Sequence, residues 1–368
     1  MKEDMRRYNL WLAFTAGLRP MRHNELIEEY GSAYDVFLAA ARGDIPSKTA
    51  ADGRMLALMK AKAEEGYIDR CLEYLHNQNI SVVLFKDKNY PALLREIHSA
   101  PAALFVKGRL PDKIRLPIAV IGSRRCSDYG RKAAEMISGQ LAECGACIVS
   151  GMAYGIDKVA AIAALERSKA EISTIAVLGS GVDVVYPEEN RKLYDEICDK
   201  GAVVSEFLPG TVPDSKHFPQ RNRIISGLCD AVIIVEAGMK SGSLITAAQA
   251  LEQNRQVYAV PGRIGDGNSE GCNHLIWQGA QIVCSYDDLL AELDLDISDS
   301  TKTNEKNILL ASDEKMLYSQ LLDFSPKSLE TLIKETGMSQ MQVFQALLTL
   351  ELKGLIKEIS KNFYIRIL

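Results

Sequence analysis

Residues 118–124 read IAVIGSR, an apolar β-branched run that ends in two small residues and an arginine. Comparable run ends recur further along the chain, as SGMAYGID (150–157), LGSGVD (178–183) and SGSLITA (241–247). Small residues at the C-terminal ends of parallel strands leave room for backbone N–H groups and helix N-termini to face an anion. Four such ends in one sheet predict a surface that binds phosphate groups.

The region around these motifs alternates between apolar strands and helical segments. The predicted strands are 118–121, 146–149, 174–178, 202–205, 231–235, 256–260 and 281–284. Their β-branched runs are continuous rather than alternating, which is typical of strands that are buried on both faces. The sequence therefore predicts an α/β protein with a doubly wound parallel sheet.

Two smaller domains are expected to flank this sheet. Apolar residues recur at helical spacing in 1–80, which predicts a small helical domain. The sheet domain is expected to span 81–293, and the polar, aperiodic segment 294–311 is expected to be a linker. In 312–368, helices joined by a glycine-containing turn precede two short strands, an order that predicts a winged-helix domain.

The composition limits the classes of function. The chain has 368 residues, of which 47% are hydrophobic and 25% charged, and its net charge is −5. An acidic chain can bind nucleic acid only through a local cluster of cations. No apolar run approaches the length that spans a membrane, and the first residues lack the apolar core of a signal peptide. We therefore expect a cytoplasmic protein that makes no membrane contact.

The segment KHFPQRNR (216–223) places cations around Phe218. Cations follow a phosphodiester backbone, while an exposed aromatic ring can stack on a base without reading its sequence. Stacking of this kind is open to single strands, whose bases are free, and not to a duplex. The alternative is that Phe218 and Pro219 only seat the helix that begins near Arg221. The cluster favours a single-stranded nucleic acid over this structural role.

Signals for catalysis are weak. The dinucleotide fingerprint lacks its third glycine, and no G-x-x-x-x-G-K-[ST] motif occurs. Asp157 and Asp183 follow glycine-rich turns, where aspartate more often fixes a turn or caps a helix than acts as a base. Glu236 ends a strand and is a candidate partner for Arg124 or Arg223. We expect no catalytic residue, no cofactor and no metal site.

The predicted winged helix has an unusual charge pattern for a reader of duplex DNA. Its second helix, 339–353, carries one lysine, one glutamate and no arginine, and the whole of 312–368 balances seven basic residues against seven acidic ones. Duplex binding depends on clustered cations. A neutral helix with Met338, Met341 and Phe344 is more typical of a protein-contact surface or a packed accessory domain.

Many ordered motifs between about residue 90 and residue 293 are shared with one known family. They are YP (90–91), IGSR (121–124), SG (150–151), GID (155–157), LGSGVD (178–183), YP (186–187), SE (205–206), FPQRNRII (218–225), VEA (235–237), SGSLITA (241–247), VPGR (260–263) and LI (275–276). On these motifs the chain resembles the DprA/Smf family, the DNA-processing proteins of natural transformation. The flanking domains are similar to the family's as well, the first of them SAM- or helix-hairpin-helix-like.

The resemblance implies an extended Rossmann-like domain that binds single-stranded DNA without catalysis. It also implies a homodimer that protects incoming DNA and loads a RecA-type recombinase onto it, with single-strand-binding protein as a further partner. The residues expected to contact DNA are Gly122, Ser123, Arg124, Gly151, Gly179, Gly181, Lys216, Phe218, Arg221, Asn222, Arg223, Ser241, Gly242 and Ser243.

Two positions depart from the family pattern. Met152 stands where the family usually has glycine, and we expect it to narrow the adjacent pocket. Ala161 stands where the family often has histidine, which weakens any catalytic role and leaves binding untouched.

Two other classes of function remain open from the residues alone. One is a Rossmann-like enzyme that hydrolyses or carries nucleoside phosphates, which turnover of a nucleoside monophosphate would favour. The other is a transcription regulator whose sheet senses a ligand and whose winged helix reads an operator. Tight, sequence-dependent duplex binding would favour the regulator.

Overall fold

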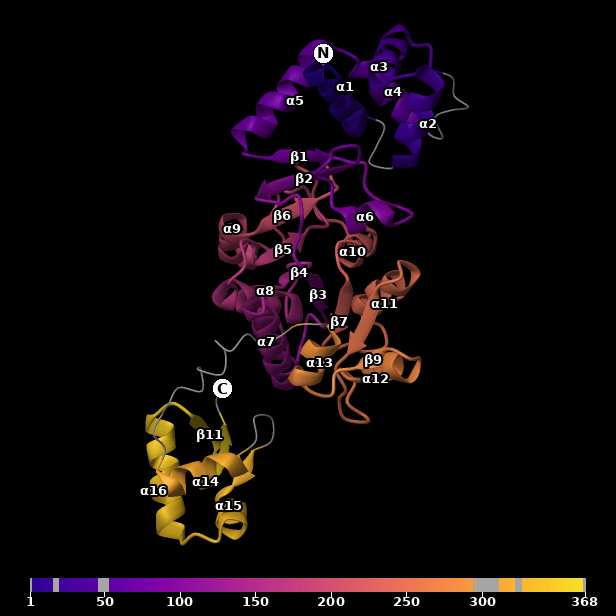
Figure 1. The fold of residues 1–368 in the computed structure, drawn as a ribbon. Coiled ribbons are helices and arrows are strands. Elements are labelled where there is room, and N and C mark those ends of the chain that lie inside the picture. Colours follow the sequence, from indigo (N-terminus) through magenta and orange to yellow (C-terminus); the bar gives the residue numbers. More distant parts are fainter. Residues whose placement is uncertain are drawn as a thin grey trace. The chain divides into compact units, whose positions relative to one another are not determined.

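The computed structural model contains two compact units, residues 1–296 and 297–368, which are described separately (Figure 1). The structure describes residues 2–15, 20–45, 53–293, 295, 311–321 and 326–366. The expected linker at 294–311 lies outside the described residues, apart from its Leu295 and Ala311. No helix in the described part of the chain is long and apolar enough to cross a membrane.

A nine-stranded sheet forms the centre of the first unit. Its strands are β1 (Ser81–Leu84), β2 (Ala103–Gly108), β3 (Pro117–Ile121), β4 (Cys147–Ser150), β5 (Thr174–Val177), β6 (Ala202–Ser205), β7 (Ala231–Ile234), β8 (Gln256–Ala259) and β9 (Gln281–Ile282). They lie in the order β1-β2-β6-β5-β4-β3-β7-β8-β9 (Figure 1). All pairs from β6 to β9 are parallel, while β1 and β2 extend one edge as antiparallel strands. The predicted parallel sheet is confirmed.

Helices cover both faces of this sheet. They are α6 (Ala92–Glu96), α7 (Asp128–Glu143), α8 (Ile156–Arg167), α9 (Arg191–Lys200), α10 (His217–Gly227), α11 (Gly242–Glu252), α12 (Glu270–Trp277) and α13 (Tyr286–Glu292), with a 3₁₀ turn η1 (Glu188–Asn190). Two neighbouring residues of β4 belong to different cores, one on each face. Val149 lies in the core that includes residues of α6, α10, α11 and α12, and Ile148 lies in the core that includes residues of α7, α8 and α13. Burial on both faces explains the continuous apolar runs.

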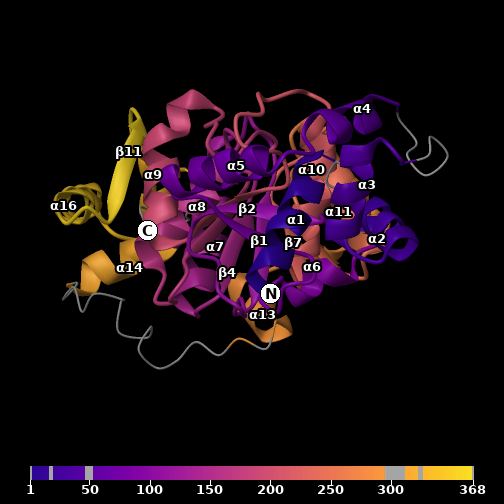
Figure 2. The same cartoon turned by 90° about the horizontal axis from the view of Figure 1, so that it is seen from above.

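The N-terminal helices pack against the antiparallel edge of the sheet. They are α1 (Lys2–Thr15), α2 (Pro20–Tyr30), α3 (Ala33–Arg42), α4 (Gly53–Ala61) and α5 (Glu65–Asn77). Trp11 and Phe37 meet edge-on inside their own small core. Phe14 contacts Phe105 of β2, with ring centroids 5.6 Å apart. Figures 1 and 2 show α1 and α5 beside β1, so these helices share one compact unit with the sheet.

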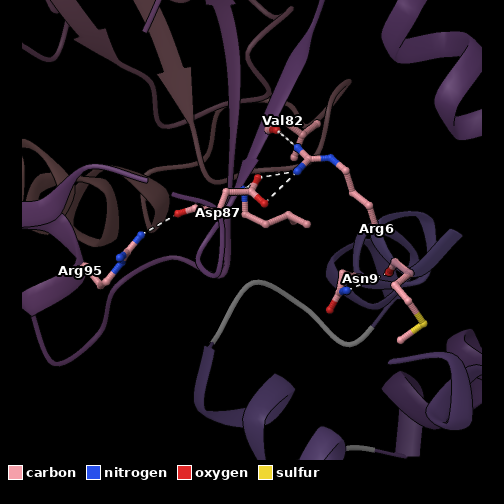
Figure 3. A network of polar contacts seen from close by, with 7 residues as sticks. Arg6, Asn9, Val82, Asp87 and Arg95 are labelled. Atoms are coloured by element: carbon pink, nitrogen blue, oxygen red, sulfur yellow. Dashed lines mark hydrogen bonds and ion pairs between the residues drawn. The ribbon is translucent and has the colours of Figure 1, made fainter. Parts of the chain in front are cut away.

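A polar contact also ties α1 to the sheet edge (Figure 3). The Arg6 guanidinium donates to both carboxylate oxygens of Asp87, at 2.8 and 2.7 Å, and to the Val82 carbonyl at 2.7 Å. Asp87 in turn accepts from the Leu84 N–H, and its carbonyl accepts from Arg95. Asp87 therefore connects α1 and the end of β1 through its carboxylate, and α6 through its backbone carbonyl.

The second unit is a winged helix, as predicted. Its elements are α14 (Ser312–Gln320), β10 (Lys327–Ser328), α15 (Leu329–Thr336), α16 (Gln340–Leu352), β11 (Ile356–Ser360) and β12 (Phe363–Arg366), and its sheet has the order β10-β12-β11. Ser339 caps α16 in a capping box with Gln342. Met341 and Phe344 are exposed on α16, whereas Met338 packs against the core and does not belong to that surface.

Candidate nucleic-acid interface

The predicted site lies at the C-terminal edge of the parallel strands. The chain runs from β3 through β4 and β5 to β6 on one side, then returns to β7 on the other side of β3. In open α/β sheets this reversal leaves a crevice outside the strand ends, where ligands bind. A cavity of about 500 Å³, here called the main cavity, occupies this position.

Most of the predicted residues meet in this cavity. Those that line it are Gly122, Ser123, Arg124, Phe218, Arg221, Asn222, Ser241, Gly242 and Ser243. A narrow neighbouring pocket, the aromatic slit, adds Gly151 and Gly179 and shares Arg124, Phe218 and Arg221 with the main cavity. Gly181 and Lys216 line neither: Gly181 donates its N–H to the Thr211 carbonyl, and exposed Lys216 sits at the start of α10.

Glycines at this edge allow the strand ends to approach one another closely. A Cβ on Gly122 would lie 2.8 Å from the Glu236 carbonyl oxygen, and a Cβ on Gly155 would lie 2.2 Å from that of Ser123. Gly155 also has a positive φ of 73°. Close backbone packing therefore accounts for these two glycines, beside any role in admitting an anion.

Two buried, oppositely charged side chains, Asp157 and Arg221, support the floor of the main cavity. The Asp157 carboxylate accepts the Gly151 N–H at 2.9 Å and also faces the N–H groups of Gly122 and Ala153. Arg221 is only 4% exposed and donates to the carbonyls of Gly151, at 2.9 Å, and Val177. Asp157 thus holds the ends of β3 and β4 to α8, and Arg221 holds the ends of β4 and β5 to α10. Arg221 is thus turned inward, where it positions the site rather than presenting a free cation.

Burial dominates the protonation of both partners. Desolvation raises the pKa of Asp157 above its ordinary 3.8, although Arg221 and the backbone N–H groups oppose that shift. Desolvation lowers the pKa of Arg221 to about 10, against the charge of Asp157. Arg221 therefore stays cationic at neutral pH, and the carboxylate depends on it for stability as an ion.

An aromatic pair lines the aromatic slit, and its Phe218 ring also lines the main cavity. The Phe218 and Tyr186 rings stack with centroids 5.5 Å apart, and the Arg124 guanidinium lies 5.1 Å from the Phe218 centroid. Phe218 is therefore half-buried between neighbours, whereas Tyr186 is 40% exposed. Sequence reasoning chose Phe218 and missed Tyr186, although the YP motif at 186–187 was a signal for it.

Cations outnumber carboxylates in the main cavity. Arg124, Arg125, Arg221 and Lys240 line it, with Asp157 as its one lining carboxylate. Arg125 and Lys240 are exposed, and sequence reasoning did not select them. Arg125 directly follows the IGSR motif and Lys240 directly precedes the SGSLITA motif, and these positions could have identified both residues in the sequence. The local positive charge contrasts with the net charge of −5 of the whole chain.

Arg223, which we predicted to contact DNA, has an acidic partner within the protein, and the predicted pairing of Glu236 was wrong. Arg223 lies on another face of α10 and pairs with Glu206 at 2.5 Å, both side chains being largely buried. Glu236 pairs with neither Arg124 nor Arg223. Its carboxylate accepts from the N–H of Ser127 at 2.8 Å and from that residue's hydroxyl, and so caps the start of α7.

The two departures from the family pattern lie together in the core. Met152 is fully buried and belongs with Ala161 to a single apolar cluster. The Met152 side chain lines neither the main cavity nor the aromatic slit, so the expectation that it narrows the pocket was wrong. Its φ of 53° is the left-handed conformation that a glycine adopts more readily.

Comparisons with known proteins agree with this geometry. Residues 81–294 match the family model of DNA recombination-mediator protein A, and residues 302–360 match that of the DprA winged helix domain. The chain belongs to the DprA family. DNA processing protein DprA of Streptococcus pneumoniae is 50% identical over 209 residues, which cover 56% of this chain and 72% of that protein.

Two solved DprA structures resemble this one. The X-ray structure of DprA from Streptococcus pneumoniae has a TM-score of 0.66 at 39% identity, and the match covers 79% of this chain and 99% of the other. A structure of DNA processing protein A from Helicobacter pylori has a TM-score of 0.53 at 30% identity, covering 59% and 97%. The description of the latter concerns its single-stranded DNA binding mode.

The electrostatic coupling of Asp157 and Arg221 gives a first test. We expect Arg221→Met to lower the free energy of unfolding by about 3–5 kcal/mol at pH 7, because it leaves the buried Asp157 carboxylate without its compensating positive charge. Urea unfolding followed by tryptophan fluorescence measures this in the first unit, since Trp11 and Trp277, the only tryptophans, both lie there.

The same variant should respond to pH. With the pKa of Asp157 raised in the folded state, protonation as the pH falls toward 3.8 removes the cost of the buried charge, so the deficit should shrink between pH 7 and pH 5. Asp157→Asn/Arg221→Met, which removes both charges, is the matched control and should recover part of the loss. An equal deficit at both pH values would contradict the electrostatic coupling of Asp157 and Arg221.

Proposed function

We propose that this protein binds single-stranded DNA in the main cavity and the aromatic slit. The observation that carries the proposal is the combination of Arg124, Arg125 and Lys240 with the Phe218–Tyr186 ring pair at the sheet's switch point. Cations that follow the backbone and rings that stack on bases are the two components of single-strand binding. Membership of the DprA family and the likeness to the Helicobacter pylori protein support it.

The rings and cations have separate tasks in this proposal. Tyr186, the more exposed ring, is the platform for a base, and Phe218 supports it from behind. Arg124 lies over Phe218 and lines both pockets, so its guanidinium can contact a phosphate while it stays against the ring. Since none of these contacts reads a base edge, we expect little sequence preference.

We further propose that the site acts without catalysis. Its ionisable groups have structural partners: Asp157 has Arg221 and backbone N–H groups, and Glu236 has Ser127. His217 contacts the Gly179 carbonyl at 3.2 Å and stacks on Phe207. A general base needs a free proton-accepting atom within reach of its substrate. Because these groups already make structural contacts within the protein, the site favours binding over turnover.

The final step of the proposal is assembly. A dimer offers two sites, and a long strand held by both gains effective concentration without new contacts. We propose that a homodimer, acting in natural transformation, protects the incoming strand and loads a RecA-type recombinase onto it, including strands coated by single-strand-binding protein. The family description as a recombination mediator supports this role.

Binding to a short oligothymidylate should be stronger than binding to a duplex of the same length and should depend steeply on salt. Each neutralised phosphate of a single strand contributes about −0.7 to the slope of log K against log salt, so three exposed cations predict a slope of roughly −2 or steeper. Fluorescence anisotropy measures both quantities. Stronger, sequence-dependent duplex binding would favour the regulator instead, and turnover of a nucleoside monophosphate would favour the enzyme.

Variants of two arginines distinguish a residue that we propose to contact DNA from a residue with a structural role. Arg124→Ala should weaken binding of single-stranded DNA by about 1.5–3 kcal/mol, because it removes a charged hydrogen-bonding group from the site. Arg223→Gln removes the same charge at a residue that lines neither pocket and can keep a hydrogen bond to Glu206. The folded fraction of this variant, checked by its unfolding curve, should bind with nearly unchanged affinity. If the two variants lose affinity equally, the site does not lie where we place it.

Light scattering and a filament-assembly assay test the assembly step. We expect twice the chain mass in solution, and faster filament formation by a RecA-type recombinase on strands coated with single-strand-binding protein. The Arg124→Ala variant should remain dimeric yet lose the stimulation. A strict monomer that still loads the recombinase would rule out the avidity argument, and a nucleotide-consuming activity of the protein alone would rule out binding without catalysis.

A further inference from the structure

A second basic cavity adjoins the proposed DNA site. It has a volume of about 670 Å³ and lies between the first turns of α7 and α8; we call it the α7–α8 cavity. Four cationic residues line it, namely Arg124, Arg125, Arg131 and Lys158, together with the exposed ring of Tyr154. No carboxylate is among its lining residues.

This cavity adjoins the main cavity. Arg124 and Arg125 follow β3 directly and line both of them. Arg124 also lines the aromatic slit, so this one residue borders all three spaces. A polyanion that leaves the main cavity past Arg124 therefore meets Arg131 and Lys158 next.

The charges facing Arg131 and Lys158 leave both cations available to a ligand. Arg131 lies 3.2 Å from Asp128 of its own helix, and the two side chains are 57% and 92% exposed. Glu189 accepts a hydrogen bond of 2.5 Å from Tyr154, which together with the nearby charge of Lys158 lowers the pKa of that carboxyl. Exposed ion pairs such as Arg131–Asp128 contribute little free energy, so a phosphate can replace Asp128 or Glu189 beside these cations at small cost.

We infer that the α7–α8 cavity binds phosphodiester phosphates of the same strand that occupies the main cavity, with Arg131 and Lys158 as the contacts. The inference rests on the proposed function and adds to it a second stretch of the binding path. A small free anion would find only hydrated, screened cations here. A strand already held in the main cavity meets these cations at high effective concentration, which favours a continuous polyanion.

A length series of oligothymidylates tests this path. Lengths from about 4 to about 16 nucleotides cover the site sizes typical of single-strand-binding folds. For the unaltered protein, affinity should rise with length until both cavities are filled. The Arg131→Gln/Lys158→Gln variant should bind the shortest oligomers as tightly as the unaltered protein does, and its affinity should stop rising at a shorter length. On the longest oligomers its salt slope should be shallower by about 1.4, because two phosphate contacts are lost.

The matched control removes two cations elsewhere on the same unit. Lys169, which follows α8, and Lys200, which ends α9, are exposed and precede β5 and β6, at the opposite edge of the sheet. Lys169→Gln/Lys200→Gln should therefore keep the length dependence and slope of the unaltered protein.

The possible outcomes separate the inference from the proposed function. Failure of the unaltered protein to bind any oligomer would remove the proposed function itself. If the unaltered protein binds and the Arg131→Gln/Lys158→Gln variant has the same length dependence and salt slope, only the inference about the α7–α8 cavity would be overturned. Equal losses on the shortest and longest oligomers would also overturn it, because the two residues would then act within the main cavity. A loss confined to duplex DNA would assign the cavity to another ligand.

Discussion

The buried pair of Asp157 and Arg221 is the constraint on which the whole site depends. The carboxylate collects N–H groups from the ends of β3 and β4, while the guanidinium binds carbonyls at the ends of β4 and β5. Without this pair, those loops would expose unpaired backbone groups to an apolar interior. Arg221 also donates to Asn222 at 3.2 Å, and Asn222 contacts the Gly242 carbonyl at 3.4 Å. The pair thereby connects α10 to the start of α11, so the cavity walls are held before any strand arrives. Such preorganisation lowers the ordering cost of binding.

The architecture followed from the sequence because parallel strands carry a strong local signal. All seven predicted strands overlap β3 to β9. Every residue of β3 to β7 is buried, and burial on both faces demands the continuous apolar runs that the sequence shows. The roles of the arginines did not follow so directly. Arg221 and Arg223 are two residues apart on one helix and face different directions, toward Asp157 and Glu206 respectively. Those partners are distant in the sequence, so no local pattern identifies them. Helical spacing counted from Phe218 gives 221, 222 and 225, all of which line the main cavity, and it excludes 223.

Met152 and Ala161 depart from the family pattern at positions that look functional in the sequence, but the structure places both of them in the apolar core. Both are fully buried in one cluster, where a methionine side chain occupies apolar space rather than the ligand pocket. The Met152 carbonyl accepts a hydrogen bond of 3.0 Å from Asn190, which holds the left-handed backbone in place. A long flexible side chain next to a small one keeps the core filled. The binding surface is thereby left to residues that the two departures do not touch.

Electrostatics also explain how an acidic chain can hold a polyanion. The cations of the site are gathered at one edge of the sheet, around Arg124, while the excess of acidic residues lies elsewhere on the chain. A cleft with low-dielectric walls concentrates the field of such a cluster, so a phosphate backbone is attracted locally although the molecule as a whole repels it. The repulsion between the acidic remainder of the chain and DNA disfavours non-specific contacts away from the site. Selectivity for single strands then comes from ring stacking, which a duplex cannot provide without unstacking its bases, and affinity comes from the local cations.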